Sequence, residues 1–384
     1  MALPDPDWPQ SSLRSNLKFS AHPLISTEQA PRPAPLDPKN LSRTQENRPT
    51  LRGGQEMLLL FLFALLAGAA AFLLFKFSTV VEGDLTLVSR GPPRRERVDG
   101  KVVWITGASR GIGEVLAMQF ANLGAKLILS ARNKDELERV KQNILSKNPD
   151  SRVEVLPMDL SAGEESLKQV VQVAESLFSN AGVAYMIHNA AFERLKRGAL
   201  EESDAGLKAT FNVNVFGTIT LTRLLAPYML DRGMGHFVVM SSAAGKVPAP
   251  GQAIYSASKH ALNGYFASLR SELCTKGIKV TVVCPGPIET PQSSGAASSA
   301  QRHSSEKRVS VERCVELTIV AATHGLKEAW ISYQPVLTVM YLVQYMPTIG
   351  YWLMDKIGAK RLDAAAKKGN TYSWNLIFGG KKSV

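Results

Sequence analysis

Between Gly100 and Tyr333 the sequence alternates short apolar runs with longer amphipathic ones. Such alternation is typical of strand-helix-strand units, which build a parallel sheet with helices on both faces. The apolar runs predict strands near residues 101–106, 126–131, 152–157, 184–188, 235–240, 279–284 and 329–333, and the amphipathic runs predict helices near 111–123, 133–146, 163–179, 205–230, 254–276 and 310–323. We therefore expect an α/β domain over residues 100–333 with a doubly wound parallel sheet of about seven strands.

The composition agrees with one globular core that carries attached segments. Of the 384 residues, 45% are hydrophobic and 20% are charged, which suffices to bury a sizeable core. The three cysteines, Cys274, Cys284 and Cys314, are too few and too widely spaced for a disulfide framework or a zinc site. We expect three reduced thiols and no bound metal.

The net charge of +12 does not indicate a nucleic-acid partner. Much of the charge lies at the end of the chain, where seven Lys or Arg residues follow Asp355 against the carboxylates of Asp355 and Asp363. The rest of the chain lacks a basic stripe with interleaved aromatic residues, so we expect no nucleic-acid binding.

The N-terminal part of the chain divides into an extension, an apolar run and a linker. Residues 1–56 are rich in Pro, Ser and Asn without an apolar period, and we expect them to be disordered. Nineteen uncharged residues follow, which as a helix cover about 28 Å, close to the ~30 Å core of a bilayer. We predict a transmembrane anchor over 57–77 and a linker over 78–99. A buried core helix and a cleaved signal peptide are the alternatives.

Met57 opens this apolar run, so translation starting there is a further hypothesis. Peptides from before Met57 in N-terminal mass spectrometry would contradict it. Lys and Arg residues flank the apolar run on both sides, which leaves the membrane orientation open.

Two later segments depart from the alternating pattern. Residues 287–310 are long, Ser-rich and unpatterned, which indicates a substrate lid or a disordered loop. The tail, residues 334–384, is apolar and then basic, and Gln344 and Pro347 interrupt its apolar part. This pattern favours a helix pair that lies in the membrane interface or closes an apolar substrate site, over a second membrane span.

A glycine-rich turn follows the first predicted strand and opens the first predicted helix. The stretch TGASRGIG gives the spacing TGxxxGxG, in which missing side chains permit a tight turn and close approach of the backbone to a pyrophosphate. In this position the motif is strong evidence for a Rossmann-type dinucleotide site. Its candidate cofactor residues are Thr106, Gly107, Ser109, Arg110, Gly111, Ile112 and Gly113.

The end of the second predicted strand indicates which dinucleotide binds. A site for NAD would carry a carboxylate there, whereas this sequence has Arg132. A guanidinium pairs with the 2′-phosphate of NADP(H), and Arg110 would add a second positive charge. Both arginines could instead be solvated surface residues. Asp159, after the third strand, would bond an adenine edge or cap the next helix.

Six motifs in order identify the chain as resembling the short-chain dehydrogenase/reductase family. They are TGASRGIG, HNAA at 188–191, NVFG at 214–217, MSSAAG at 240–245, YSASK at 255–259 and PGPIET at 285–290. The resemblance implies a nicotinamide cofactor held by Asn189, Pro285, Gly286, Ile288 and Thr290, besides the glycine-rich turn. It also implies that Asn214 holds a water next to the catalytic lysine, although an asparagine bonded within the helices is the alternative.

Three of these positions would carry the chemistry. Tyr255 and Lys259 lie four residues apart on one predicted helix, so the ammonium can approach the phenol and lower its pKa, as a general acid/base requires. Ser242 follows the fifth strand, at the edge where such sheets bind ligands, and would bond the substrate oxygen. Lys259 would also hold the nicotinamide ribose.

One motif departs from the family pattern. The usual NNAG reads His188, Asn189, Ala190 and Ala191, which adds a methyl group near the cofactor and puts the detailed fit in doubt. We interpret His188 as a residue of the strand end and not as a catalyst.

The sequences EGDLTL at 82–87 and WISYQPVLTVMYLVQYMP at 330–347 are most similar to the membrane-anchored dehydrogenase/reductase member 7 subgroup, and less so to 11β-hydroxysteroid dehydrogenase-like members. This similarity implies NADP(H)-dependent interconversion of a lipophilic carbonyl and alcohol, such as a steroid or retinoid, at an intracellular membrane, with a homodimer left open. The terminal KKSV resembles an endoplasmic-reticulum retrieval signal. The alternative function is a cofactor-binding scaffold of the same fold.

Overall fold

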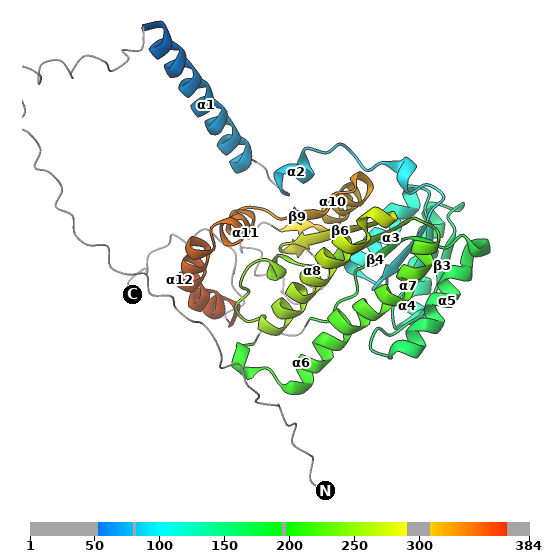
Figure 1. Ribbon diagram of the computed structural model, residues 1–384. Coiled ribbons are helices and arrows are strands. Elements are labelled where there is room, and N and C mark those ends of the chain that lie inside the picture. The colour runs from blue at the N-terminus through cyan, green and yellow to red at the C-terminus, as the bar shows by residue number, and fades with distance from the viewer. Residues whose placement is uncertain (1–52, 80–81, 194–196, 290–307, 367–384) are drawn as a thin grey trace, which may run out of the picture. The chain divides into compact units, whose positions relative to one another are not determined.

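The computed structural model describes residues 53–79, 82–193, 197–289 and 308–366 (Figure 1). The chain divides into two compact units, residues 1–67 and 68–384, and the division falls inside helix α1. Most of the predicted extension, Thr290, the centre of the predicted lid and the terminal lysines lie outside the described residues.

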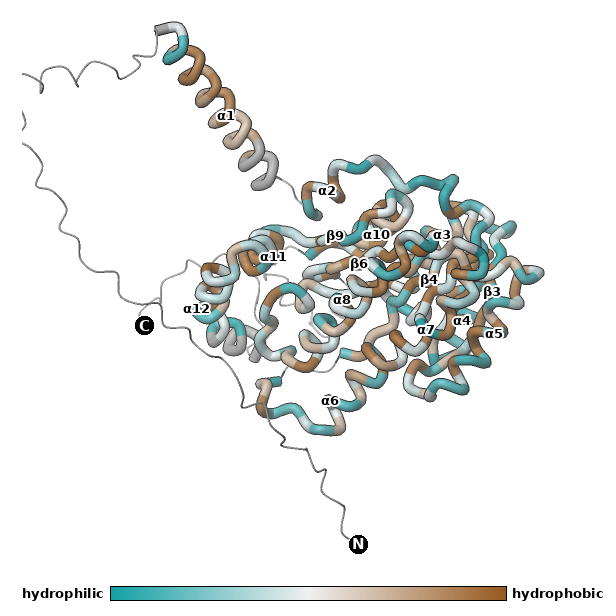
Figure 2. Tube along the Cα trace, viewed as in Figure 1, coloured by the Kyte–Doolittle hydropathy of each residue, from teal (hydrophilic) through white to brown (hydrophobic). Residues whose placement is uncertain are grey.

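Helix α1, Gly53–Thr79, contains the predicted anchor. Its apolar side chains are exposed, as shown by Phe63 at 72% and Leu66 at 67%, and Figure 2 colours most of the helix as hydrophobic. Within the described ranges it is the one helix long and apolar enough to cross a membrane, from Gly54 to Phe72, and none of that span is buried. The membrane anchor stays a prediction, and the buried core helix remains its alternative.

The central sheet has the seven predicted strands, all parallel. They are β1 Val102–Thr106, β2 Lys126–Ser130, β3 Val153–Val155, β4 Val183–His188, β5 Gly235–Met240, β6 Ile278–Pro285 and β9 Glu328–Ile331. Their order, β3-β2-β1-β4-β5-β6-β9, reverses direction between β1 and β4. The doubly wound sheet is confirmed, and ligands bind such sheets at the carboxyl ends of the strands beside this reversal.

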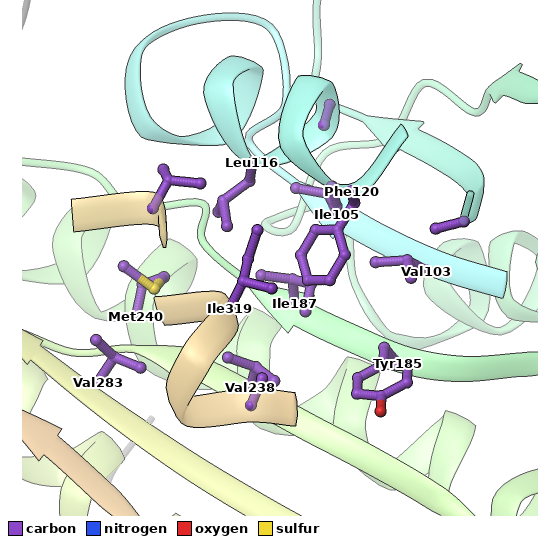
Figure 3. Packing of buried hydrophobic residues seen from close by; sticks show 14 of the residues in the cluster. Val103, Ile105, Leu116, Phe120, Tyr185, Ile187, Val238, Met240, Val283 and Ile319 are labelled. Carbon is purple, nitrogen blue, oxygen red and sulfur yellow. The ribbon is translucent and has the colours of Figure 1, made fainter. Parts of the chain in front are cut away.

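Side chains alternate along each strand between two apolar cores, because successive residues point to opposite faces. Val103 and Ile105 of β1 belong to one core, whereas Val102 and Trp104 belong to the other. The first core includes α3 Gly111–Asn122, α4 Lys134–Lys147 and α10 Val311–His324, and the second includes α5 Glu164–Asn180, α7 Thr218–Asp231 and α8 Ala253–Leu273. Figure 3 shows Phe120 of α3 and Ile319 of α10 against β1 and β4 in the first core.

The helix expected near residues 205–230 is present, and its centre is π-helical. The structure has α6 Asp204–Phe211, a π-helical segment η4 Asn212–Gly217, and α7. A Cβ on Gly217 would meet the Leu160 carbonyl oxygen at 2.3 Å, so the backbone there packs closely against the loop after β3. A π turn keeps the helical side-chain pattern, and the sequence period therefore gives no sign of it.

The region predicted as an unpatterned loop contains short strands at its two margins. Residues Ile288–Glu289 form β7 and residues Val309–Ser310 form β8, and the two strands pair in parallel. This pair fixes the positions at which the segment leaves and re-enters the domain.

The linker after α1 is tied to the edge strand of the sheet. The Asp84 backbone N–H donates to the Trp330 carbonyl at 2.9 Å, and the Asp84 carboxylate accepts from the Trp330 N–H at 2.7 Å and from the Leu87 N–H at 2.9 Å. Asp84 thus covers the outer edge of β9 and caps α2, Leu85–Val88. Burial raises the pKa of this carboxyl group, although the backbone hydrogen bonds oppose that effect. The EGDLTL motif is therefore part of the folded domain.

The tail folds as the predicted helix pair, α11 Val336–Tyr345 and α12 Pro347–Ala366. Leu337 and Met340 of α11 are fully buried in the second core, so α11 is not a membrane span. The Gln344 side chain donates to the Lys246 carbonyl at 2.8 Å. The pair therefore packs beside the segment that follows β5.

Candidate active site

A cavity of about 430 Å³ lies at the carboxyl ends of the strands beside the reversal of the sheet. Eight of the predicted site residues line it: Ile112, Asn189, Ser242, Tyr255, Lys259, Pro285, Gly286 and Ile288. They come from separate motifs, and the fold brings them to one place. The residues predicted for the phosphate end, Arg110, Arg132 and Asp159, do not line this cavity.

The glycine-rich turn needs its glycines for two different reasons. Gly107 and Gly111 have positive φ angles of +66° and +58°, which L side chains rarely adopt. A Cβ on Gly113 would lie 2.1 Å from the Gly107 carbonyl oxygen, so this glycine permits close packing of α3 on the turn. The positive φ angles and the close packing give a tight turn at the start of α3.

Thr106 and Asn189 hold this turn against the end of β4. The Thr106 hydroxyl donates to the Ile187 carbonyl at 3.2 Å and accepts from the backbone N–H groups of Asn189 and Ala190, both at 3.1 Å. The Asn189 amide donates to the carbonyls of Thr106 at 3.0 Å and Gly107 at 3.2 Å. These contacts fix the turn beside the end of β4, where Asn189 also lines the cavity.

Lys259 is a buried amine, only 2% exposed. Its Nζ donates to the Met240 carbonyl at the end of β5, at 2.8 Å, and lies 5.5 Å from the centre of the Tyr255 ring. Burial lowers the pKa of Lys259 to about 8, against a weaker opposing effect of Glu193. The helical spacing predicted an ammonium near the phenol oxygen; the structure places it beside the ring, and its effect on the phenol stays a prediction.

Ser242 lies on a short turn that hydrogen bonds tie to α8. The Ser242 hydroxyl accepts from the Ala244 N–H at 3.1 Å. The Ser256 hydroxyl donates to the Ala244 carbonyl at 2.5 Å, and the Asn263 amide donates to the Gly245 carbonyl at 2.7 Å. Ser242 and Tyr255 therefore belong to one rigid unit. Sequence reasoning missed Ser256 and Asn263, although both share the helix of Tyr255.

Asn214 occupies the π-helical segment and is fully buried. Its Oδ1 accepts from the Phe192 N–H at 2.6 Å, and its Nδ2 donates to the Phe192 carbonyl at 3.0 Å and to the Ser258 hydroxyl at 3.1 Å. Ser258 precedes Lys259 in α8, so Asn214 reaches the catalytic helix through it. These contacts match the alternative of an asparagine bonded within the helices, and the water-holding role stays a prediction.

At the predicted phosphate end, Arg110 and Arg132 are exposed. Burial acts to raise the pKa of Asp159, but hydrogen bonds from Ser161 and the charge of Arg132 outweigh it, so the pKa is lowered. Asp159 does not cap the next helix, because the N-cap of α5 is Gly163. It accepts instead from the Ser161 backbone at 2.9 Å and the Ser161 hydroxyl at 2.7 Å.

Arg139 is a further residue that sequence reasoning missed. It donates to the Ser109 carbonyl inside the glycine-rich turn at 3.0 Å and pairs with Glu114 of α3 at 2.8 Å. Arg139 therefore holds the glycine-rich turn in place from helix α4.

His188 and Ala191 clarify the departure from the family pattern. Burial lowers the pKa of His188 to about 3, and its Nε2 lies 2.8 Å from the Thr222 hydroxyl, so the ring is a neutral core group. Ala191 lines the cavity, so its methyl group does face the cofactor side.

Comparison with known proteins identifies the family. A family model described as short chain dehydrogenase matches residues 101–301. The chain belongs to the short-chain dehydrogenase family. It is therefore an oxidoreductase that interconverts CH–OH and C=O groups with a nicotinamide cofactor, as its motifs predicted.

Individual relatives agree with this family assignment. The chain is 36% identical to human dehydrogenase/reductase SDR family member 7, over 73% of this chain and 86% of that protein. It is also 36% identical to 11-beta-hydroxysteroid dehydrogenase A of Sesamum indicum, over 61% of this chain and 63% of that protein. Among solved structures, L-sorbose reductase of Gluconobacter frateurii with NADPH and L-sorbose is similar, with a TM-score of 0.55 and 26% identity over 62% of this chain and 96% of the reductase. The resemblance to the family and to the member 7 subgroup is confirmed.

The tie between the Ser242 turn and α8 leads to a prediction for Asn263→Ala. This change removes the hydrogen bond to Gly245 and should lower kcat by up to about 10²-fold, the cost of a small misplacement of catalytic groups, with little effect on NADPH affinity. Steady-state kinetics and a cofactor titration measure the two effects. Ser268→Ala is the control, because that exposed hydroxyl bonds only within α8. An unchanged kcat would show that the tie does not position Ser242.

Proposed function

We propose that this chain is a membrane-anchored NADP(H)-dependent oxidoreductase that interconverts a lipophilic carbonyl and alcohol. The observation that carries the proposal is the meeting of Ser242, Tyr255 and buried Lys259 at one cavity. The relative from Sesamum indicum is named for a hydroxysteroid, which supports a steroid or a similar flat lipid as the substrate. Ala243, Val247 and Val336 add apolar walls to the cavity.

The residues of the chain fit NADP(H), the expected cofactor. The positive φ of Gly107 and the close packing at Gly113 leave backbone exposed for a pyrophosphate. Exposed Arg132 follows β2, where a carboxylate would repel a 2′-phosphate. The solved reductase of similar structure holds NADPH. When bound, the cofactor supplies or accepts the hydride.

The arrangement around Tyr255 indicates which side chain exchanges a proton with the substrate. The buried amine of Lys259 lies beside the Tyr255 ring, which supports Tyr255 as the group that exchanges the proton. In the direction of carbonyl reduction, the Tyr255 hydroxyl gives its proton to the substrate oxygen, while the Ser242 hydroxyl donates a hydrogen bond to that oxygen. In the direction of oxidation, Tyr255 takes the proton back.

The membrane part of the proposal rests on α1 and on the tied linker. The exposed apolar span from Gly54 to Phe72 is long enough to hold the chain in a bilayer. The terminal KKSV favours the endoplasmic reticulum.

Tyr255→Phe should lower the turnover of a lipophilic ketone by about 10²–10⁴-fold, the usual scale for a general acid/base, and leave NADPH affinity nearly unchanged. NADPH oxidation against a panel of steroid and retinoid carbonyls measures the rate. Tyr228→Phe on the outer part of α7 is the control. Equal turnover in the Tyr255 variant would exclude Tyr255 as the proton donor. A wild-type protein that binds NADPH but reduces none of the panel would favour the scaffold.

Arg132→Asp should shift the preference from NADP(H) towards NAD(H) by about tenfold or more, because a carboxylate repels the 2′-phosphate and accepts from a ribose hydroxyl. The ratio of kcat/KM values for the two cofactors measures the shift. Lys147→Asp, at the far end of α4, makes the same change in charge and should leave the ratio constant. A constant ratio in the Arg132 variant as well would refute the phosphate assignment.

The full chain in microsomes should stay in the membrane pellet after carbonate extraction. A double variant, Leu62→Lys with Leu66→Lys, should move to the supernatant, because each charge at the centre of a span costs about 3 kcal/mol. Recovery of the wild-type protein in the supernatant would contradict the anchor. Protease protection in intact vesicles then gives the side of the catalytic domain.

A further inference from the structure

A lysine that follows Ser242 by four residues forms an ion pair with the edge strand of the sheet. The Lys246 Nζ lies 2.9 Å from each carboxylate oxygen of Glu328, the first residue of β9. Water screens this pair only in part, because the two side chains are 13% and 34% exposed. The Trp330 indole N–H donates to the same carboxylate. Glu328 is therefore held within β9 and is a fixed partner for Lys246.

The backbone of Lys246 is held as well. Its carbonyl accepts from the Gln344 side chain of α11 at 2.8 Å, and its N–H donates to the Ala243 carbonyl at 2.9 Å. Ala243 directly follows Ser242, so Lys246 closes the turn that carries the Ser242 hydroxyl. The side chain and the main chain of Lys246 are thus bound to β9, to α11 and to the turn itself.

Lys246 lies inside a run of residues that forms a wall of the active-site cavity. Residues 242–244 line the cavity before it, and residues 247–249 line the cavity after it. Lys246 and Glu328 are not among the described residues that line the cavity, and the Lys246 side chain extends instead to β9. Two hydrogen bonds from α8 go to the residues just before Lys246. The ion pair therefore holds the next part of this wall to a different element.

We propose that Lys246 and Glu328 are positioning residues, whose ion pair fixes the position of the Ser242 hydroxyl for the reaction. This inference rests on the proposed function, in which Ser242 bonds the substrate oxygen. A hydrogen bond to an oxygen that gains charge in the transition state depends steeply on geometry. A small displacement of Ser242 should therefore lower kcat more than it weakens substrate binding.

Glu328→Gln removes the charge of the pair with little change in shape. The amide oxygen can still accept from Trp330, but Lys246 loses its counter-charge. An ammonium without a partner is costly in a partly buried place, so it should move towards water. The turn that Lys246 closes should then move with it.

The experiment uses the full-length protein with NADPH and the panel of steroid and retinoid carbonyls, with kinetics on the member that the wild-type protein reduces fastest. Glu328→Gln and Lys246→Met should each lower kcat by about 10- to 10²-fold, the cost of a small misplacement of catalytic groups, with KM and NADPH affinity nearly unchanged. Lys246→Arg should retain most of kcat, because a guanidinium pairs with the same carboxylate. Glu154→Gln is the control, since it removes a carboxylate that pairs with Lys141 at 3.6 Å between β3 and α4.

Ser242→Ala separates a positioning role from general support of the fold. In that background Glu328→Gln should change kcat by less than about twofold, because both changes remove the same contact with the substrate oxygen. An equal loss of kcat with and without the Ser242 hydroxyl would overturn the inference, since the pair would then act on another group. Wild-type kcat in both Glu328→Gln and Lys246→Met would overturn it as well.

These outcomes are distinct from a failure of the proposed function. A wild-type protein that binds NADPH but reduces no member of the panel would overturn the proposed function and this inference together. An active enzyme that is insensitive to the pair would overturn the inference alone. Melting temperature and NADPH affinity show that each variant is folded. If Glu328→Gln does not fold, the comparison of Lys246→Met with Lys246→Arg, with and without the Ser242 hydroxyl, decides the same question.

Discussion

In a parallel sheet that is covered on both faces, the ends of the strands are where a ligand can bind. In this chain the side chains of each strand alternate between two apolar cores, and helices cover both of them. The ends of the strands leave room for polar groups from several segments. Thr106 at the end of β1, Asn189 after β4 and Ser242 after β5 all occupy that edge. Asn189 and Ser242 line the cavity there, so the position of the cavity follows from the topology.

Lys259 is a buried charged side chain that contacts the end of the sheet and lies beside Tyr255. It brings a charged amine into a region where an unpaired charge is costly, and the Met240 carbonyl at the end of β5 compensates part of that cost. The same burial that lowers the pKa of Lys259 strengthens its influence on the Tyr255 ring, because little water screens the two groups. Ser256 and Asn263 then tie the Ser242 turn to the same helix. One helix thus carries Tyr255 and Lys259, and hydrogen bonds from the same helix hold the turn that carries Ser242.

The sequence predicted the strands and the glycine-rich turn, and it singled out residues that the structure brings to one cavity. These features depend on local patterns: apolar period, missing side chains and fixed spacing along one helix. It did not predict contacts between distant segments. The hydrogen bonds between Asp84 and Trp330 need the register of an edge strand, and Asn263 looks like any other polar residue of a helix. The π turn at Asn214 leaves the helical pattern intact, so the pattern reads as one helix.

Strand β9 adjoins both the linker after α1 and segments that line the cavity. One edge of β9 pairs with β6, whose end carries the cavity residues Pro285 and Gly286. On the other edge, Trp330 holds Asp84 of the linker, and the chain then continues into α11, where Val336 forms a wall of the cavity. Strand β9 therefore contacts the linker along one edge and leads into a wall of the cavity at its end.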